Sequence, residues 1–164
     1  VLNADLNRTV NLSLGIGCFV LEQYDDALYF INRGITWFKE DARDEHSAQA
    51  HLLLLMICYS INNSRLFDSE YRSAYSYFYK RKKKHPFETA LVQCLHRSFY
   101  LKEQSKKIVE FKKTLELFEK NKEDVVQQMA FNYPGWLQSR IQRISYRQFV
   151  ERSVRSGNRK PESA

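Results

Sequence analysis

The sequence predicts an all-α fold of stacked antiparallel helix pairs, with about seven helices. Along most of the chain, apolar residues recur every three or four positions, as they do on a helix with one buried face. Five glycines and three prolines among 164 residues are too few for the many tight turns of an all-β chain. The helical segments also come in pairs with a period of roughly 34–47 residues, which is typical of an α-solenoid.

The first pair of helices is expected over residues 5–21 and 24–40. The apolar residues of its first helix form two faces, namely Leu6, Val10, Leu14, Cys18 and Leu21, and then Leu12, Ile16 and Phe19. A helix that is apolar on two faces is usually sandwiched between neighbours. The second helix turns Leu28, Ile31, Ile35 and Phe38 inward, and a charged turn at 40–44 ends it.

The second pair is expected over 44–61 and 66–83. Asp44 is a suitable N-cap, and the first of these helices carries the apolar run 52–59. Asn62-Asn63-Ser64 breaks the pattern before the next helix. The stripe of that helix predicts a buried face, with Tyr77 as the exposed tyrosine; the stripe comprises Phe67, Tyr71, Ala74, Tyr75 and Phe78.

The third pair is expected over 86–101 and 105–121, with Pro86 at a helix start, where proline is tolerated. The connector 122–132 can begin with a helical turn. Pro134-Gly135 then marks a break, and a last helix is expected over 136–150. The chain is interpreted as one domain over 1–150, followed by a polar basic tail over 151–164.

The first pair resembles a tetratricopeptide repeat. The matching positions are Leu14, Gly15, Tyr24, Ala27 and Gly34. The resemblance implies that Gly15 and Ala27 meet at a close helix crossing, and that Gly34 admits the first helix of the next unit. The units are then 8–41, 45–84 and 86–121. Lys39 stands where such a repeat usually closes with a proline.

The longer pattern resembles C-terminal segments of tetratricopeptide-repeat proteins of the Bacteroidota, in which a basic helix like 77–84 precedes an aromatic-rich ending like 131–141. This resemblance implies an α-α superhelix with a protein-binding or scaffold role and no enzymatic activity. In such arrays the first helix of each pair lines the concave surface. The solvent-facing polar residues expected there are Asn7, Asn11, His51, Gln93 and Arg97, with Gln49 as a further candidate.

A nucleic-acid-binding helical module is the alternative. Residues 1–60 hold 4 Lys/Arg against 8 Asp/Glu, whereas residues 61–164 hold 22 against 11. The cations form a run at the end of the fourth helix and a series expected to be one stripe on the last helix. They are Lys80, Arg81, Lys82, Lys83 and Lys84, and then Arg140, Arg143 and Arg147. Convergence of these two groups on one face would favour nucleic acid as the partner.

No pattern indicates an enzyme, a cofactor or a metal. The four histidines form no HExxH motif, and neither a GxxxxGK[ST] nor a GxGxxG sequence is present. The longest apolar run, residues 52–59, is short for a membrane span, which needs about 20 residues. Three cysteines without a CxxC pair favour a reducing, cytoplasmic setting. Cys18, Cys58 and Cys94 are expected to be buried thiols at equivalent places on the odd-numbered helices.

Overall fold

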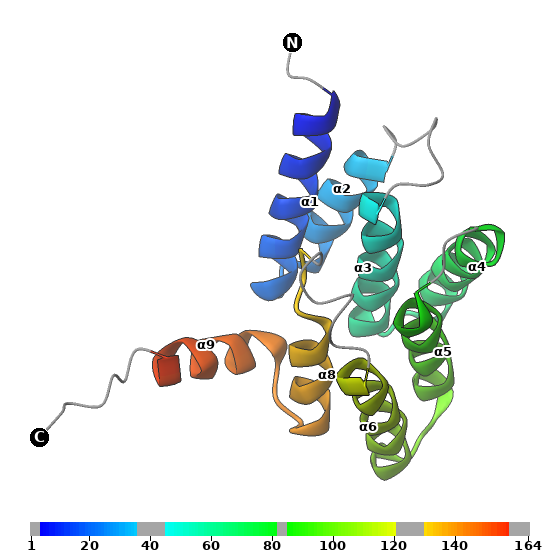
Figure 1. The fold of residues 1–164 in the computed structure, drawn as a ribbon, viewed down its shortest axis with the longest axis vertical. Helices are drawn as coiled ribbons and strands as arrows, with labels where there is room; N and C mark the ends of the chain where they lie inside the picture. Colours follow the sequence, from blue (N-terminus) through cyan, green and yellow to red (C-terminus); the bar gives the residue numbers. More distant parts are fainter. Residues whose placement is uncertain (1–3, 36–44, 82–84, 121–129, 158–164) are drawn as a thin grey trace, which may run out of the picture.

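The computed structural model describes residues 4–35, 45–81, 85–120 and 130–157, and within these ranges it is all-helical without a strand. Its helices are α1 (Ala4–Val20), α2 (Tyr24–Ile35), α3 (Glu45–Ile61), α4 (Ser64–Lys80), α5 (Pro86–Tyr100), α6 (Gln104–Lys120), α8 (Tyr133–Ile141) and α9 (Tyr146–Gly157). Helices α1 to α6 pack as three antiparallel pairs, and α8 and α9 follow them (Figure 1). The predicted fold class is confirmed.

Helix α3 is the centre of the molecule. It contacts α1 and α2 of the first pair, α4 of its own pair, and α5 of the third pair. Every side chain from Leu52 to Cys58 is at most 2% exposed. A helix that is apolar all round has to be covered all round, and the apolar run of α3 is therefore explained by its central position.

Gly15 lies where α1 crosses α2. A Cβ atom added at Gly15 would come within 2.4 Å of Ile31 Cδ1 and 3.4 Å of the Ala27 carbonyl oxygen. Only a residue without a side chain therefore fits this crossing undisturbed. A Cβ added at Gly34 would meet, among the described residues, only Asn11 Cβ at 3.8 Å. An added side chain at Gly34 would therefore point toward α1.

The outer face of α1 differs from the prediction. Leu12 and Phe19 are buried, whereas Leu6, Val10, Leu14 and Leu21 are 44–51% exposed. The expected sandwich is wrong because, among the described helices, α2 and α3 pack on one side of α1 and α9 contacts it near Phe19, at its end (Figure 1).

The single last helix expected over 136–150 is also wrong. Arg143 adopts a left-handed backbone conformation with a φ of 58°, which ends α8 and turns the chain into α9. The amide of Ile144 donates to the Ser139 carbonyl at 3.0 Å, the closing hydrogen bond of a helix C-terminus. Helix α9 continues to Gly157, so the first half of the expected tail is helical, and 158–164 lie outside the described residues.

Candidate binding surface

The inner side of the odd-numbered helices is filled by the chain itself. The Phe131 ring lies 5.7 Å from Phe19 of α1, and the Trp136 ring lies 6.0 Å from Tyr59 of α3. Trp136 is fully buried, and Figure 1 shows α8 below α1 and α3 and beside α6. Residues 130–141 therefore pack on α1 and α3, where part of the predicted partner surface would lie.

Two of the predicted contact residues do not face solvent. Asn11 is 5% exposed, and its Nδ2 donates to the Asn7 carbonyl oxygen and to Asn7 Oδ1, both at 2.8 Å. The ring of His51 is half-buried and lies 4.4 Å from the Tyr77 ring, and burial lowers the pKa of His51 to about 4. Gln49 is buried and accepts a hydrogen bond from the Ala130 amide at 3.3 Å. The prediction of a solvent-facing row is wrong for Asn11, His51 and Gln49 because α2, α4 and the C-terminal segment cover these positions.

Of the other three predicted residues, Asn7 is half-buried on α1, whereas Gln93 and Arg97 are exposed on α5. Arg97 Nη2 donates to Gln93 Oε1 at 3.4 Å, and Arg97 Nη1 lies 3.6 Å from Glu110 Oε2 of α6. Gln93 lies at the edge of a groove between α4 and α5. This pair of side chains therefore borders a surface that the sequence did not single out.

A ladder of three tyrosines runs along α4, and two of them, Tyr75 and Tyr79, line this groove. Tyr71, Tyr75 and Tyr79 follow one another at successive turns, with ring centroids 6.0 Å and 6.2 Å apart. Tyr75 is 52% and Tyr79 71% exposed, while Tyr71 stacks on His96 of α5 at 4.0 Å. The groove has a volume of about 160 Å³ and is lined by Tyr75, Phe78, Tyr79, Thr89, Val92 and Gln93.

The sequence predicted that Tyr77 is the exposed tyrosine of α4, but the structure exposes Tyr75 and Tyr79 instead. Tyr77 is half-buried against His51 of α3, and the spacing of Tyr71, Tyr75 and Tyr79 puts the ladder on the outer face. Their i, i+4, i+8 spacing was the available signal, because it describes one face whichever way that face points.

The cations of the predicted basic run do not share one environment. Lys80 is exposed at the end of α4, whereas Arg81 is 5% exposed. Arg81 Nη1 donates to both carboxylate oxygens of Glu88, at 2.7 Å and 2.9 Å, and so joins the end of α4 to the start of α5. Arg81 is therefore part of a buried ion pair, and not of a solvent-facing patch. Lys82, Lys83 and Lys84 lie outside the described residues.

The three arginines expected on one helix stripe are separated. Arg140 is largely covered on α8: its guanidinium lies 4.8 Å from the Trp136 ring centroid, and Nη2 donates to Ser60 Oγ at 3.0 Å. Burial lowers the pKa of Arg140. Arg143 is in the turn, and Arg147 lies on α9, where its Nε is 2.9 Å from Glu151. Since α9 and the end of α4 lie on opposite sides of Figure 1, the two cationic groups do not converge.

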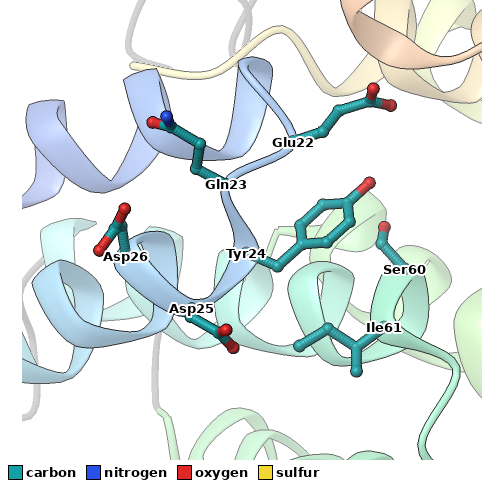
Figure 2. A pocket seen from close by; sticks show the side chains of 7 residues that line it. All are labelled: Glu22, Gln23, Tyr24, Asp25, Asp26, Ser60 and Ile61. Carbon is teal, nitrogen blue, oxygen red and sulfur yellow. The ribbon is translucent and has the colours of Figure 1, made fainter.

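A hollow of about 520 Å³ lies beside the turn between α1 and α2. It is lined by Glu22, Gln23, Tyr24, Asp25, Asp26, Ser60 and Ile61. Figure 2 shows the carboxylates of Glu22, Asp25 and Asp26 pointing in different directions. Within the described ranges, no three His, Cys, Asp or Glu side chains are placed to hold a metal ion. The hollow is thus an acidic surface feature without converging ligands.

Comparisons with family models, with curated proteins and with solved structures gave no match to this chain. In the part of the chain that the structure describes, no helix has both the length and the apolar character needed to cross a membrane. The interpretation of the α4–α5 groove therefore depends on its own geometry.

Proposed function

We propose that this chain is a non-catalytic, tetratricopeptide-type module that binds an extended segment of another protein in the α4–α5 groove. The observation that carries the proposal is the exposed pair of Tyr75 and Tyr79, stacked at 6.2 Å beside the buried side chains of Phe78 and Val92. Exposed tyrosines beside an apolar groove are typical of protein-binding surfaces, where such rings act as anchors.

The groove offers the two kinds of contact that an extended peptide needs. The tyrosine rings provide flat apolar area, against which proline and other apolar side chains pack. The tyrosine hydroxyls and the Gln93 amide can hydrogen-bond to peptide backbone groups, which an extended segment leaves unpaired. Arg72, Lys80 and Arg97 are exposed near the groove and favour a segment with acidic residues.

Nucleic acid remains the second candidate, because stacked exposed tyrosines beside a lysine can also stack bases. The separation of Arg140, Arg143 and Arg147 from α4 counts against it. The module is further proposed to work in a reducing, cytoplasmic setting, which the three free cysteines support.

The test is a selection of random peptides on the immobilised chain, followed by affinity measurements. Replacing both Tyr75 and Tyr79 with Ala should weaken the selected peptides by about 30-fold or more, the effect of losing about 2 kcal/mol at an anchor. Tyr29→Ala is the matched control, because Tyr29 is 56% exposed on α2 and far from the groove. Equal binding by the double variant and the control would reject the groove.

A salt titration with a random single-stranded oligonucleotide separates the two candidates. We expect weak binding that falls steeply with salt, and replacing Lys82, Lys83 and Lys84 with Ala should lower both affinity and salt slope. The same triple change should leave peptide binding nearly intact. Tight oligonucleotide binding that survives high salt and depends on Tyr75 and Tyr79 would make nucleic acid the partner.

A further inference from the structure

From Leu6 to Val20, the part of α1 whose side chains the structure describes, the exposed residues carry no charge. They are Leu6, Thr9, Val10, Ser13, Leu14 and Gly17. Asp, Glu, Lys and Arg make up 27% of the chain, and the outer helix α6 exposes Lys112, Lys113 and Glu116 on its surface. An uncharged outer helix face in such a chain is unusual for a surface that meets water.

Exposed aliphatic side chains also gather at this end of the molecule. Among the described residues, the large aliphatic side chains with high exposure lie on α1, directly after it, or on α9, with one exception, Val109 of α6. They are Leu6, Val10, Leu14, Leu21 and Val154. Leu6, Val10 and Leu14 follow one another at successive turns of α1, and an apolar stripe of this kind marks an interaction surface.

The corresponding face of α3 is covered. Ala50, Leu54 and Cys58 follow Val10, Leu14 and Cys18 by 40 residues each, and all three are at most 2% exposed. The equivalent positions are therefore covered by protein on α3, in the middle of the stack, and exposed to water on α1, at its end; Leu54 and Leu14 are one such pair. This comparison indicates that the outer face of α1 is built to be covered by another helix.

Helix α9 extends from the foot of this face. Its first residue, Tyr146, is buried against Phe19 and Phe131, but the stretch from Glu151 to Ser156 is exposed and includes Arg152, Val154 and Arg155. In Figure 1, α2 and α3 lie on one side of α1, and α9 runs away on the other. The exposed part of α9, residues 151–156, is called the basic arm below. It projects on the side from which a second molecule would reach α1.

The acidic turn after α1 complements this arm. Glu22, Asp25 and Asp26 are exposed at the foot of α1, next to the start of α9. A second copy placed on the α1 face, with its own α1 running in parallel, would set its acidic turn over the basic arm of the first. Two-fold symmetry repeats the same contact in the other direction.

We propose that two copies of this chain pair through the outer faces of α1, with α9 of each copy reaching the acidic turn of the other. This pairing is independent of the α4–α5 groove, which lies on the other side of the molecule (Figure 1). A membrane is a poorer occupant of the α1 face, because the exposed carboxylates of Glu22, Asp25 and Asp26 at the end of that face would repel anionic headgroups. An uncharged apolar face is, in contrast, complementary to itself.

The first test is the molar mass of the full chain, measured by light scattering and sedimentation equilibrium over micromolar concentrations. The wild-type chain should be a dimer, and Leu14→Glu should be a monomer, because each carboxylate would be buried against its symmetry mate. Val109→Glu is the matched control, since it places the same charge at an exposed aliphatic position of α6, and it should remain a dimer. Circular dichroism verifies folding, and Thr9→Glu gives a second disruption at a polar position of the same face.

A wild-type monomer at every concentration, or a dimer that neither Leu14→Glu nor Thr9→Glu weakens, would overturn the proposal. A dimer that Val109→Glu also dissociates would show that another surface forms it.

Charge reversal tests the proposed contact between α9 of one copy and the acidic turn of the other. Replacing both Arg152 and Arg155 with Glu should weaken the dimer at least tenfold, and so should replacing both Asp25 and Asp26 with Lys. Because opposite charges are restored when all four changes are combined, the combined variant should dimerise more tightly than either double variant. A combined variant weaker than both would exclude the contact between α9 and the acidic turn.

Discussion

Helices α1 and α3 each begin a pair and each has 17 residues, yet their surroundings differ. Neighbours cover α3 on all sides, and its side chains from Leu52 to Cys58 are buried. Helix α1 is also rich in apolar residues, but Leu6, Val10 and Leu14 face solvent. The difference teaches that burial is set here by position in the stack, since a similar pattern is covered in one place and exposed in the other.

The largest expected effect contrasts one leucine from each helix. Leu55→Ala should lower the free energy of unfolding by about 2–5 kcal/mol, because Leu55 is 0% exposed and its removal leaves a cavity. Leu14→Ala should change the free energy of unfolding by no more than about 0.5 kcal/mol at concentrations where the chain is monomeric. Urea denaturation of both variants measures the two changes in the free energy of unfolding. Equal changes would contradict the difference between α1 and α3.

His51 gives α3 a pH dependence in the acidic range. Burial lowers the pKa of His51 from 6.5 to about 4, so between these values the unfolded chain binds a proton that the folded chain does not. The free energy of unfolding should therefore fall as the pH drops through this window, by up to about 3 kcal/mol. His51→Phe, which keeps a ring against Tyr77, should flatten that part of the profile. An unchanged slope in the variant would assign the pH dependence to other groups.

The two sides of α1 are compared at two glycines, of which Gly15 is buried and Gly17 is exposed. Gly15→Leu should lower the free energy of unfolding by about 1–3 kcal/mol, because even a Cβ would lie 2.4 Å from Ile31 Cδ1. Gly17 has no described atom within 4 Å of an added Cβ, so Gly17→Ala should be neutral or stabilising. Thermal melts of the two variants test this. Matching melting temperatures for Gly15→Leu and wild type would contradict the close crossing.

The smallest effect is on thiol reactivity. Cys58 and Cys94 are buried, and burial raises their pKa values to about 12 and about 11, which keeps both protonated at neutral pH. Cys18 is only partly covered, contrary to the expectation of three buried thiols. A thiol reagent should label Cys18 of the native chain well before Cys58 and Cys94, followed by mass spectrometry of the peptides. If the reagent labelled all three cysteines at the same rate, Cys18 of α1 would be no more accessible than Cys58 of α3 and Cys94 of α5.

The helices were predictable because their signals are local. Pro86 begins α5, and Asn62-Asn63 separates α3 from α4, where Asn63 Oδ1 accepts from the Leu66 amide at 3.1 Å. The break between α8 and α9 was missed, since its left-handed residue is Arg143 and not a glycine or asparagine. Without such a marker, the apolar spacing of two short helices is read as one longer helix.

The surfaces were harder to predict than the helices. Arg81 lies in a run of cations and reads as solvent-facing, and only the fold brings it to Glu88. The exposure of Tyr75, and the covering of Asn11 and His51, depend on neighbours that come from distant parts of the sequence. Periodicity identifies which residues share a face, but the long-range packing decides what that face meets.

The segment from Phe131 to Ile141 also bears on how the chain folds. In a simple repeat array each unit touches only its neighbours, so the array can fray from either end. Here Phe131 contacts Phe19 near the start of the chain, while Trp136 contacts Phe111 in the third pair. The contact between Phe19 and Phe131 joins residues more than a hundred positions apart in the sequence. Because such contacts raise the contact order, we expect this chain to fold more slowly than an open repeat array. Since Phe131 contacts both Phe19 of α1 and Tyr146 of α9, we expect the first and last helices to unfold together, in one cooperative transition.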